Sequence, residues 1–575
     1  MEKKWIVKNG HDWIEVEALK NALQVDKIVA QLLLQRGISN FEEAEQFFRP
    51  KLNHLHNPFL MKGMELAVKR LNKAIDNKEN ILLFGDYDVD GTTAVALLFS
   101  YLRMHTAAID FYIPDRYSEG YGVSFQGIDF AEKHKQTLII ALDCGIKAID
   151  KVAYAKRKGI DFIICDHHEP GDLLPDAIVL DPKQKDCKYP YKELSGCGVG
   201  FKLLQALVEQ NSYKLEPLYS FLDLVAISIG ADIVQITGEN RIMCYHGLKQ
   251  LNEKPRIAFQ ELILAAKRKF PLTLTDVVFT IAPRINAAGR ISSGRTAVEL
   301  MISKDESVIK KLVSAIEQDN RERKELDKEI TAEALTLIEE DKLFQQKSTT
   351  VVFQPHWHKG VVGIVASRLI EKHYRPTIVL TETNGIVGGS ARSVEHFDLY
   401  KALEECSDLL IQFGGHAHAA GMTLKKENVA AFAKKFDEIV KKRITIDSCM
   451  PSQVVDICID LNEIQLHEDP NQIPRLKRII EAFEPHGPGN MKPVFMTSNL
   501  FASDSRVLKD EHLKLRILQP NSKYVFDAIG FSLADREFNT AKGIPFEMVY
   551  TLETNEFNGK KSIQLNIKDI RAMTN

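Results

Sequence analysis

One stretch limits the folds open to this chain more than any other: the apolar run Ile81–Phe84, followed at once by a turn that holds three aspartates at alternate positions. A short apolar run of this kind is typical of a buried strand, and residues 92–104 fit a helix. Strand, turn and helix predict a unit of a parallel sheet, in which ligands gather at the carboxyl ends of the strands. The turn consists of Gly85, Asp86, Tyr87, Asp88, Val89, Asp90 and Gly91.

Three carboxylates this close repel one another unless a cation lies among them, and a divalent metal is the simplest such cation. The spacing also matches the start of an EF-hand calcium loop. That loop needs a bidentate Glu at its twelfth position, where this chain has Leu97. We therefore reject the EF-hand and keep a solvated acidic loop as the alternative for this stretch taken alone.

Composition narrows the class of protein. A length of 575 residues predicts about three to five domains. No apolar run approaches a membrane span and the N-terminus lacks a secretory signal, so we expect a cytoplasmic protein without membrane contacts. The eight cysteines form no CxxC pair, which indicates reduced thiols. Because the net charge is only −3, nucleic acid would have to bind at local basic patches.

Further apolar runs in the first half of the chain also end in metal-binding side chains. Predicted strands at 108–113, 137–142, 162–165 and 177–180 alternate with helical or loop stretches, which favours a doubly wound parallel sheet. One Asp after a strand is usually a helix N-cap, but several acids together with two histidines predict a metal site. Such ligands suit Mn²⁺ or Mg²⁺, and they suffice for the two ions used in phosphoester hydrolysis. The side chains in question are Asp143, Asp166, His167, His168 and Asp232.

A second constellation is basic. Residues 281–295 place three arginines among small residues, where a phosphate backbone can approach guanidinium groups closely. A surface loop with ordinary salt bridges is the alternative. The candidate strand-binding residues are Arg284, Asn286, Arg290 and Arg295, with Arg116 as a further candidate in a similar setting.

The second half predicts a long helix and an anion cradle. Residues 306–341 carry a helical pattern whose section 318–329 is polar on nearly all sides, which is typical of a helix that bridges two lobes. Beyond it, glycines beside Ser, Arg and His offer backbone N–H groups and a guanidinium to an anion. A zinc site is the alternative for the two histidines, but no further ligands accompany them. The cradle residues are Gly389, Ser390, Arg392, Gly414, Gly415, His416 and His418.

The C-terminal part alternates apolar and polar residues over short runs separated by turns. Five such strands fit a small antiparallel barrel of the OB type, a fold that grips single strands. A β-module for contacts between domains is the alternative. The predicted strands lie at 454–461, 512–517, 524–531, 546–552 and 562–567.

Four motifs resemble, in order, those of the DHH phosphoesterase superfamily: residues 85–91, 142–145, 166–168 and 231–232. The segment 283–290 resembles a DNA-facing segment of the superfamily's bacterial exonucleases, and residues 414–421 resemble the hallmark of DHHA1 domains. The expected fold class is therefore α/β: a parallel-sheet DHH domain and a second α/β domain, DHHA1, joined by a long helix, with a C-terminal all-β OB-like barrel. The expected parts are an N-terminal helical segment (1–60), the DHH catalytic domain (61–304), a connecting helix (305–345), the DHHA1 domain (346–450) and the OB-like domain (451–575).

The resemblance implies a single-stranded-DNA-specific exonuclease that works from the 5′ end, releases mononucleotides by two-metal hydrolysis and acts in DNA repair and recombination. It implies two Mn²⁺ or Mg²⁺ ions, and a single-strand-binding protein and a recombination helicase as partners; we expect a monomer. Two alternatives stay open: a DHH phosphodiesterase of short oligonucleotides or cyclic dinucleotides, and a non-catalytic DNA-binding relative.

The resemblance also implies roles for individual residues. Asp143 would bridge the two ions, His168 would steady the phosphate or the leaving oxygen, and Asp166 would orient its neighbours. Ser390 and Arg392 would hold the terminal 5′-phosphate in a cleft lined by both cradle histidines. The expected metal ligands are Asp86, Asp88, Asp90, Asp143, His167 and Asp232.

One position departs from the family pattern. Many DHH enzymes carry a His four residues before Asp88, where this chain has Phe84. Either the first metal has one ligand fewer, or Asp86 supplies it.

Overall fold

The computed structural model describes residues 2–464, 472–540 and 543–573. The chain forms two compact units. The first consists of His11–Asn320 with Arg475–Lys492, and the second of Met1–Gly10, Arg321–Pro474 and Pro493–Asn575. None of the described helices combines the length and the apolar character needed to cross a lipid bilayer.

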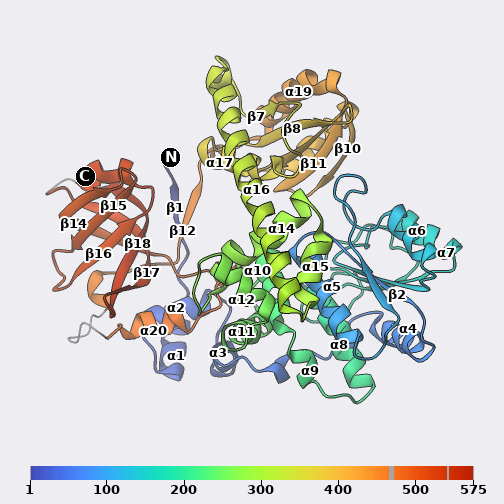
Figure 1. Cartoon of the computed structure of the whole chain (residues 1–575). Helices are drawn as coiled ribbons and strands as arrows, with labels where there is room; N and C mark the ends of the chain where they lie inside the picture. The colour runs from blue at the N-terminus through green and yellow to red at the C-terminus, as the bar shows by residue number, and fades with distance from the viewer. Residues whose placement is uncertain (1, 465–471, 541–542, 574–575) are drawn as a thin grey trace. The chain divides into compact units, whose positions relative to one another are not determined.

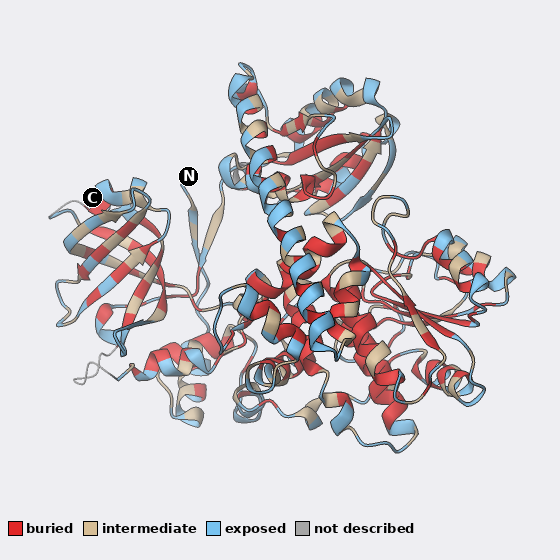
Figure 2. Cartoon of the chain, in the orientation of Figure 1, coloured by how far each residue is buried: buried red, intermediate tan, exposed pale blue. Residues whose placement is uncertain are grey.

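The first unit is built around the parallel sheet that contains β2 (Figure 1). Its strand order is β3-β2-β4-β5-β6. Because side chains alternate between the faces of a strand, Ile81 and Leu83 join one hydrophobic core while Leu82 and Phe84 join another. Both faces are buried (Figure 2), which explains why these strands are unbroken apolar runs. The strands are β2 (Ile81–Gly85), β3 (Ile109–Tyr112), β4 (Leu138–Leu142), β5 (Asp161–Cys165) and β6 (Ile178–Leu180).

Helices cover both faces of this sheet, so the expected α/β architecture is confirmed. On one face lie α4 (Met64–Asp76), α5 (Val89–Leu102) and α8 (Gly196–Gln210); on the other lie α6 (Phe125–Lys133) and α7 (Ile149–Arg157). Helix α5 begins at Val89 rather than at the predicted residue 92, because Asp88 serves as its N-cap.

The rest of the first unit is helical. The apolar run before Asp232 is a buried helix, α10 (Leu222–Ala231), and the arginine-rich segment is helix α14 (Ala282–Ile291). The other helices are α1 (Trp13–Leu23), α2 (Lys27–Leu34), α3 (Phe41–Phe48), α9 (Glu216–Tyr219), α11 (Gly238–Glu253), α12 (Ile257–Ala265), α13 (Leu274–Asp276), α15 (Gly294–Ile302) and α20 (Arg475–Glu481). The long helix α16 (Glu306–Glu340) was predicted, and the boundary between the units falls within its polar section.

A C-terminal segment belongs to the first unit, which no sequence pattern indicated. Arg241 of α11 is buried and donates hydrogen bonds to the Phe483 carbonyl at 2.8 Å and to the Phe47 carbonyl at 3.0 Å. The backbone N–H of Ile236 also bonds to the carbonyl of Pro488. These bonds attach residues 475–492 to the helices around the sheet.

The second unit contains a mixed sheet in the order β10-β11-β9-β8-β7, in which only β7 and β8 run parallel. Helix α17 (Val362–Lys372) packs on the face that carries Val379, while α18 (Leu399–Glu404) and α19 (Val429–Arg443) pack on the face that carries Ile378. The strands are β7 (Thr350–Phe353), β8 (Thr377–Thr383), β9 (Ile386–Arg392), β10 (Leu410–Gly415) and β11 (Ala419–Leu424).

The C-terminal strands close into a barrel, as expected, because β14 pairs with both β15 and β17. The strand predicted at 454–461 is wrong: it splits into β12 (Ser452–Val455), which pairs with the N-terminal strand β1 (Lys4–Val7), and β13 (Ile457–Cys458), which runs beside β14. The barrel strand that the prediction missed is β14 itself. The barrel consists of β14 (Phe495–Leu508), β15 (His512–Leu518), β16 (Val525–Gly530), β17 (Phe546–Phe557) and β18 (Lys560–Ala572).

The strand β1 corrects the purely helical expectation for the first sixty residues. The indole N–H of Trp5 donates to Asp569 at 2.9 Å, and the ammonium of Lys8 lies 2.6 Å from Asp456. These partners lie more than four hundred residues away in the chain, so no local pattern could have indicated the strand.

Candidate metal centre

Three carboxylates lie directly after neighbouring strands of the parallel sheet. Asp86 follows β2, Asp143 follows β4 and Asp166 follows β5. The register pairs the last residue of β2 with that of β4, and the last residue of β4 with that of β5. Each carboxylate residue is at most 2% exposed. Parallel alignment therefore brings acids from separate runs to one edge of the sheet.

The turn after β2 is fixed by a capped helix and a glycine. Oδ1 of Asp88 accepts the Gly91 N–H at 3.1 Å as the N-cap of α5. A Cβ at Gly91 would lie 2.6 Å from backbone atoms of Asp86, so glycine is needed for the helix to pass so close to the strand end. Asp90 consequently lies in the first turn of α5 and is 1% exposed.

Asp90 also holds a second helix in place, a role that the sequence did not indicate. Its carboxylate accepts the N–H groups of Gly196 and Cys197, in the first turn of α8, at 2.7 and 2.8 Å. It accepts the Ser228 hydroxyl at 2.7 Å. A carboxylate at a helix N-terminus is stabilised by the helix dipole. Gly196 lets Asp143 approach, because a Cβ there would lie 2.6 Å from the Asp143 Cβ.

The carboxylates converge on one nitrogen. Nε2 of His167 lies 3.2 Å from Asp143 Oδ1 and 3.5 Å from Asp232 Oδ2. Asp90 Oδ2 lies 3.8 Å from the same nitrogen. This nitrogen, Asp143 Oδ1 and Asp86 Oδ2 are buried and have no hydrogen-bond partner in the protein. Acid and imidazole atoms arranged in this way fit a divalent cation, whose charge would offset their desolvation.

The raised pKa values of the acids in this cluster also favour a bound cation. Burial, followed by the charges of Asp90 and Asp88, raises the pKa of Asp232 to about 8. Burial and the charge of Asp90 also raise the pKa of Asp143 well above its ordinary range. A bound cation would restore ionisation. Two triads bring ligand atoms within 4.8 Å of one another: Asp143, His167 and His168, and Asp90, His167 and Asp232.

Asp166 is tied to the two histidines that follow it. Its Oδ1 accepts Nδ1–H of His168 at 2.7 Å and the His167 N–H at 2.8 Å, while Oδ2 accepts the Ile146 N–H at 2.9 Å. Burial opposes its ionisation, but the hydrogen bond and charge of His168, the Ile146 N–H and the charge of His167 together outweigh burial and hold the pKa of Asp166 at about 2. Burial likewise opposes protonation of His168, yet the Asp166 carboxylate raises the pKa of His168 to about 9. Asp166 thus favours the protonated form of His168 at neutral pH.

Phe84 contributes no ligand. It is fully buried and its ring centroid lies 5.3 Å from that of Tyr112, in the core beneath α6 and α7. Asp86, two residues later, keeps Oδ2 free of protein hydrogen bonds. Of the two alternatives for the first metal, this geometry favours the one in which Asp86 replaces the missing His.

The candidate strand-binding residues divide into two groups. The guanidinium of Arg116 lies 4.9 Å from the ring centroid of Tyr87, between the motif aspartates, and the Arg290 charge acts on the same tyrosine. Gly289 makes this packing feasible, since a Cβ there would lie 2.4 Å from the Tyr87 carbonyl oxygen. Asn286 is half-buried on α14. Arg116 and Arg290 therefore lie beside the turn that holds the motif aspartates.

Two other arginines are engaged within the protein. Arg284 is 9% exposed, forms an ion pair with Glu317 and donates to the Thr280 carbonyl at 2.7 Å. Arg295 pairs with Glu299 at 2.8 Å. The placement of Arg284 argues against a direct phosphate contact, because it is buried and two of its nitrogens already donate, to Glu317 of α16 and to the carbonyl of Thr280 just before α14.

The predicted anion cradle lies in the second unit, around the end of β9. Arg392 donates to the Ser390 hydroxyl at 2.9 Å. Gly363 lets the first turn of α17 reach both, because a Cβ there would lie 3.0 Å from each side chain. The turn with the exposed residues His416 and His418 adjoins this place, since Ala419 of β11 pairs with Arg392. The sequence did not indicate that the N-terminus of α17 belongs to the cradle.

Glycines of the neighbouring strands complete the cradle. A Cβ at Gly389 would lie 2.3 Å from the Leu380 side chain, and one at Gly415 would lie 2.3 Å from the Ala419 carbonyl oxygen. Gly414 is exposed with open space around it. The first two glycines thus serve close strand packing, while Gly414 leaves room for a ligand.

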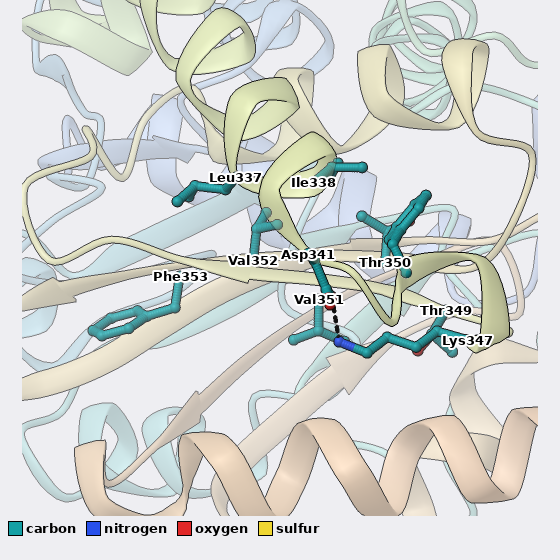
Figure 3. Close-up of a pocket in the computed structure, with 10 residues that line it drawn as sticks. Leu337, Ile338, Asp341, Lys347, Thr349, Thr350, Val351, Val352 and Phe353 are labelled. Atoms are coloured by element: carbon teal, nitrogen blue, oxygen red, sulfur yellow. Dashed lines mark hydrogen bonds and ion pairs between the residues drawn. The ribbon is translucent and has the colours of Figure 1, made fainter.

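A cavity of about 170 Å³ lies elsewhere in the second unit, between the end of α16 and β7 (Figure 3). Its only lining acid among the described residues, Asp341, is paired with Lys347. Thr350 Oγ1 is buried there without a hydrogen-bond partner. The cavity offers no set of metal ligands comparable with the cluster at the parallel sheet.

Two residues near the cluster were missed. The hydroxyl of Tyr121 lies 3.3 Å from both the Asp143 carbonyl and Nε2 of His168. Asp181 follows β6 as directly as the other acids follow their strands, and it is fully buried. The strand-end rule that found Asp143 would have found Asp181, whereas no comparable signal marks Tyr121.

Comparisons with known proteins agree with this architecture. Three domain descriptions match: the DHH family, N-terminal domain, over residues 80–229; the DHHA1 domain over 346–442; and the RecJ OB domain over 456–569. The single-stranded-DNA-specific exonuclease RecJ of Bacillus subtilis is 38% identical over 98% of this chain and 70% of its own length. The protein of the same name from Haemophilus influenzae is 31% identical over 95% of this chain and 96% of its own length.

A solved structure is similar over the whole chain. RecJ from Thermus thermophilus, crystallised in complex with Mn²⁺, is 25% identical and has a TM-score of 0.83. The match covers 100% of this chain and 80% of that one.

Proposed function

Because the chain belongs to the RecJ family of single-stranded-DNA-specific exonucleases, we propose that it hydrolyses single-stranded DNA from the 5′ end to mononucleotides, in DNA repair and recombination. The observation that carries the proposal is the convergence of three carboxylates on Nε2 of His167, with buried oxygens that lack protein partners. That donor set suits a divalent ion rather than a thiolate-bound zinc.

We propose that six residues hold two Mn²⁺ or Mg²⁺ ions, with Asp143 shared between them. When bound, such ions lower the pKa of a water and neutralise charge on the phosphate. The Mn²⁺ complex of the Thermus thermophilus relative supports this choice of ion. The six residues are Asp86, Asp88, Asp90, Asp143, His167 and Asp232.

We propose that His168 donates a hydrogen bond to the phosphate or to the leaving oxygen. Its pKa of about 9 keeps it protonated at neutral pH, and its Nδ1–H is fixed on Asp166. The remaining nitrogen, Nε2, is then a donor, held 3.3 Å from the Tyr121 hydroxyl. Preorganised donors of this kind stabilise charge that develops in the transition state.

We propose that the cradle around Ser390 and Arg392 holds the terminal 5′-phosphate. A guanidinium, a hydroxyl and the N-terminus of α17 lie together there, and all three favour a doubly charged phosphate. Recognition of a terminal phosphate, rather than an internal one, is what would make the enzyme an exonuclease with 5′ polarity.

We propose that the C-terminal barrel holds the strand beyond the cleavage site. In OB-folds the loop between the fourth and fifth strands contacts nucleic acid, and here it is the hairpin of β17 and β18. The tip carries Phe557, 71% exposed, paired with Lys560 across a turn at Asn558 and Gly559. Both turn residues have positive φ, at 51° and 73°, as a tight two-residue hairpin turn requires.

The proposed domain limits keep to the predicted ranges 61–304, 305–345, 346–450 and 451–575, with 1–60 as an N-terminal segment, except that residues 475–492 pack with the first unit. The two alternative functions explain less. A phosphodiesterase of dinucleotides has no use for a barrel with an extended hairpin. A non-catalytic relative has no reason to keep unpartnered acid oxygens at the first two motifs and an unpartnered imidazole nitrogen at the third. Rates on 5′-labelled long strands and on dinucleotides would separate them, since we expect clear preference for the long strand.

Substitution of the shared ligand tests the proposed function. Asp143→Ala should lower cleavage of a 5′-labelled single strand by more than about 100-fold, because even residues outside the ligand shell cost 10- to 100-fold. It should still bind the strand in a gel-shift or anisotropy assay. Asp172→Ala, which removes an exposed acid from the same region, is the matched control. Near-normal cleavage by Asp143→Ala would reject the assignment.

A further inference from the structure

The end of strand β6, at the edge of the parallel sheet, has no role in the metal centre described so far. Strand β6 is followed directly by Asp181, which is fully buried and whose Oδ2 has no hydrogen-bond partner in the protein. It lies close to the third motif, because the backbone N–H of Asp166 bonds to the carbonyl of Leu180 at 3.0 Å. A buried acid next to the cluster calls for an explanation of its own.

Asp181 shapes a rigid turn. Its Oδ1 accepts the Lys183 N–H at 2.7 Å, and its carbonyl accepts the Gln184 N–H at 3.3 Å. Pro182 occupies the second position, so Asp-Pro begins a tight turn with the side-chain bond that such turns favour. The Gln184 side chain donates to the carbonyls of Val179 and Asp181, at 3.1 and 3.2 Å. The direction in which Lys183 leaves the backbone is thereby fixed.

The side chain of Lys183 reaches the residue that follows the histidine pair. It is 21% exposed, and its ammonium lies 3.6 Å from Oε1 of Glu169. Glu169 follows the histidine pair directly and is 71% exposed. A long ion pair with so exposed a partner contributes little stability, so it can exchange readily.

Lys183 leaves the sheet at the same strand edge as the proposed metal ligands. Three residues before it, the carbonyl of Leu180 accepts the N–H of Asp166, the residue that precedes His167. On the side of the first motif, the guanidinium of Arg116 lies 4.9 Å from the ring centroid of Tyr87. Two cations thus lie near different ligands of one cluster.

We propose that Lys183 is a substrate-binding residue whose ammonium leaves Glu169 and contacts the phosphate of the strand at the metal centre. A lysine is suited to this because its ammonium is a compact charge on a flexible stem, with three donors that can follow a moving phosphate. The inference rests on the proposed function and extends it by one residue. Asp181 is then a positioning residue that acts through the turn.

Substitution of Lys183 should affect Mn²⁺ affinity and kcat/KM differently, and this difference distinguishes a substrate-binding role from a structural one. Removing a cation near the ligands should leave Mn²⁺ affinity unchanged or slightly higher, while removing a phosphate contact should lower kcat/KM. We expect Lys183→Met to lower kcat/KM on a single strand by about 10- to 100-fold, the range of one charged hydrogen bond. Mn²⁺ affinity is measured by calorimetry without substrate. Lys185→Met, an exposed lysine two residues away, is the control.

Substitution of Glu169, the partner of Lys183, should have the opposite effect on substrate binding. Glu169→Gln removes the competitor for the ammonium, so we expect a lower KM with kcat little changed, whereas a merely structural ion pair predicts similar losses for both variants. Lys183→Arg should recover part of the rate because the charge is kept.

Several results would overturn the inference. It fails if Lys183→Met cleaves within about twofold of Lys185→Met, or if its Mn²⁺ affinity falls in parallel with its rate. If the wild-type protein does not cleave at all, the proposed function fails by itself. Lys183 is then judged by single-strand affinity in Ca²⁺, where Lys183→Met has to bind more weakly than Lys185→Met for the inference to stand.

Discussion

Asp166 binds no metal in the proposed centre, yet the geometry of both histidines depends on it. It is 1% exposed and accepts hydrogen bonds from both of them and from Ile146. The carboxylate fixes which nitrogen of His168 carries the outward N–H, as the partners of metal-site histidines generally do. A change here therefore alters the charge of His168 and the orientation of both histidines together.

The substitution Asp166→Asn should move the alkaline limit of activity. In the wild-type protein His168 loses its proton only as the pH rises through about 9, so the proposed donor persists across the neutral range. Without the carboxylate its pKa should fall toward the ordinary value of about 6.5, and the alkaline limb of kcat/KM should move down with it. We also expect a loss of about 10- to 100-fold at neutral pH. An unshifted alkaline limb would exclude His168 as the donor.

At the scale of the residue, the sequence predicted where the acids lie in the fold better than it predicted which groups the buried side chains contact. Acids that directly follow apolar runs could be found because parallel strands end at one edge, which holds for Asp143 and Asp166 alike. The second role of Asp90 could not be found, since its partners Gly196 and Ser228 lie more than a hundred residues away. The same is true of Arg284, whose ion pair with Glu317 depends on how α14 packs against α16.

Among the elements, the first turn of α8 has little room for a larger side chain. Gly196→Ala would place a Cβ 2.6 Å from the Asp143 Cβ and 2.7 Å from its Oδ1, so helix or acid has to shift. We expect a loss of about 1–3 kcal/mol in unfolding free energy, typical of overpacking, together with reduced cleavage. Thermal melts and initial rates measure both.

Gly198→Ala is the matched control for this substitution. Gly198 lies in the same turn, gains the same helix propensity, and has its nearest contact at 3.3 Å, to the Ser195 hydroxyl. Equal effects of the two substitutions would show that Gly196 does not support the acid.

The proposed role of the hairpin of β17 and β18 in strand binding predicts an effect on long substrates. Replacing both Phe557 and Lys560 by Ser should weaken binding of long single strands by about 10-fold or more, since one stacked base contributes ~1–3 kcal/mol. Cleavage of short oligonucleotides should not change. Phe538→Ser, an equally exposed aromatic elsewhere in the barrel domain, is the control, and anisotropy at low salt is the measurement. A loss that is independent of strand length would contradict the proposal.

The elements that were not predicted from the sequence were missed for identifiable physical reasons. Strand β14 changes the parity of its buried side chains: Phe495 and Thr497 are buried, then Leu500, because Asn499 has a φ of 57° and the register shifts there. An alternation pattern broken in this way does not predict a strand. The apolar run before Asp232 did not reveal its type, since fully buried helices and strands are equally apolar.

At the scale of the molecule, two compact units carry different halves of the proposed chemistry. The acid cluster belongs to the unit with the parallel sheet, and the phosphate cradle to the unit that continues from Arg321. The sequence located this division, because a helix that is polar on nearly all sides cannot lie inside one core. It did not show that residues 475–492 return to the first unit, since carbonyls that accept from a buried arginine leave no local pattern.

The central claim is that one metal centre degrades single strands from the 5′ end. The most direct measurement follows nucleotide release from a single strand that is open, blocked at its 5′ end or blocked at its 3′ end, with Mn²⁺ and with EDTA. The account predicts mononucleotides from the open and the 3′-blocked strand with Mn²⁺, none from the 5′-blocked strand, and none with EDTA until Mn²⁺ is restored. Release in EDTA, or degradation of the 5′-blocked strand alone, would contradict it.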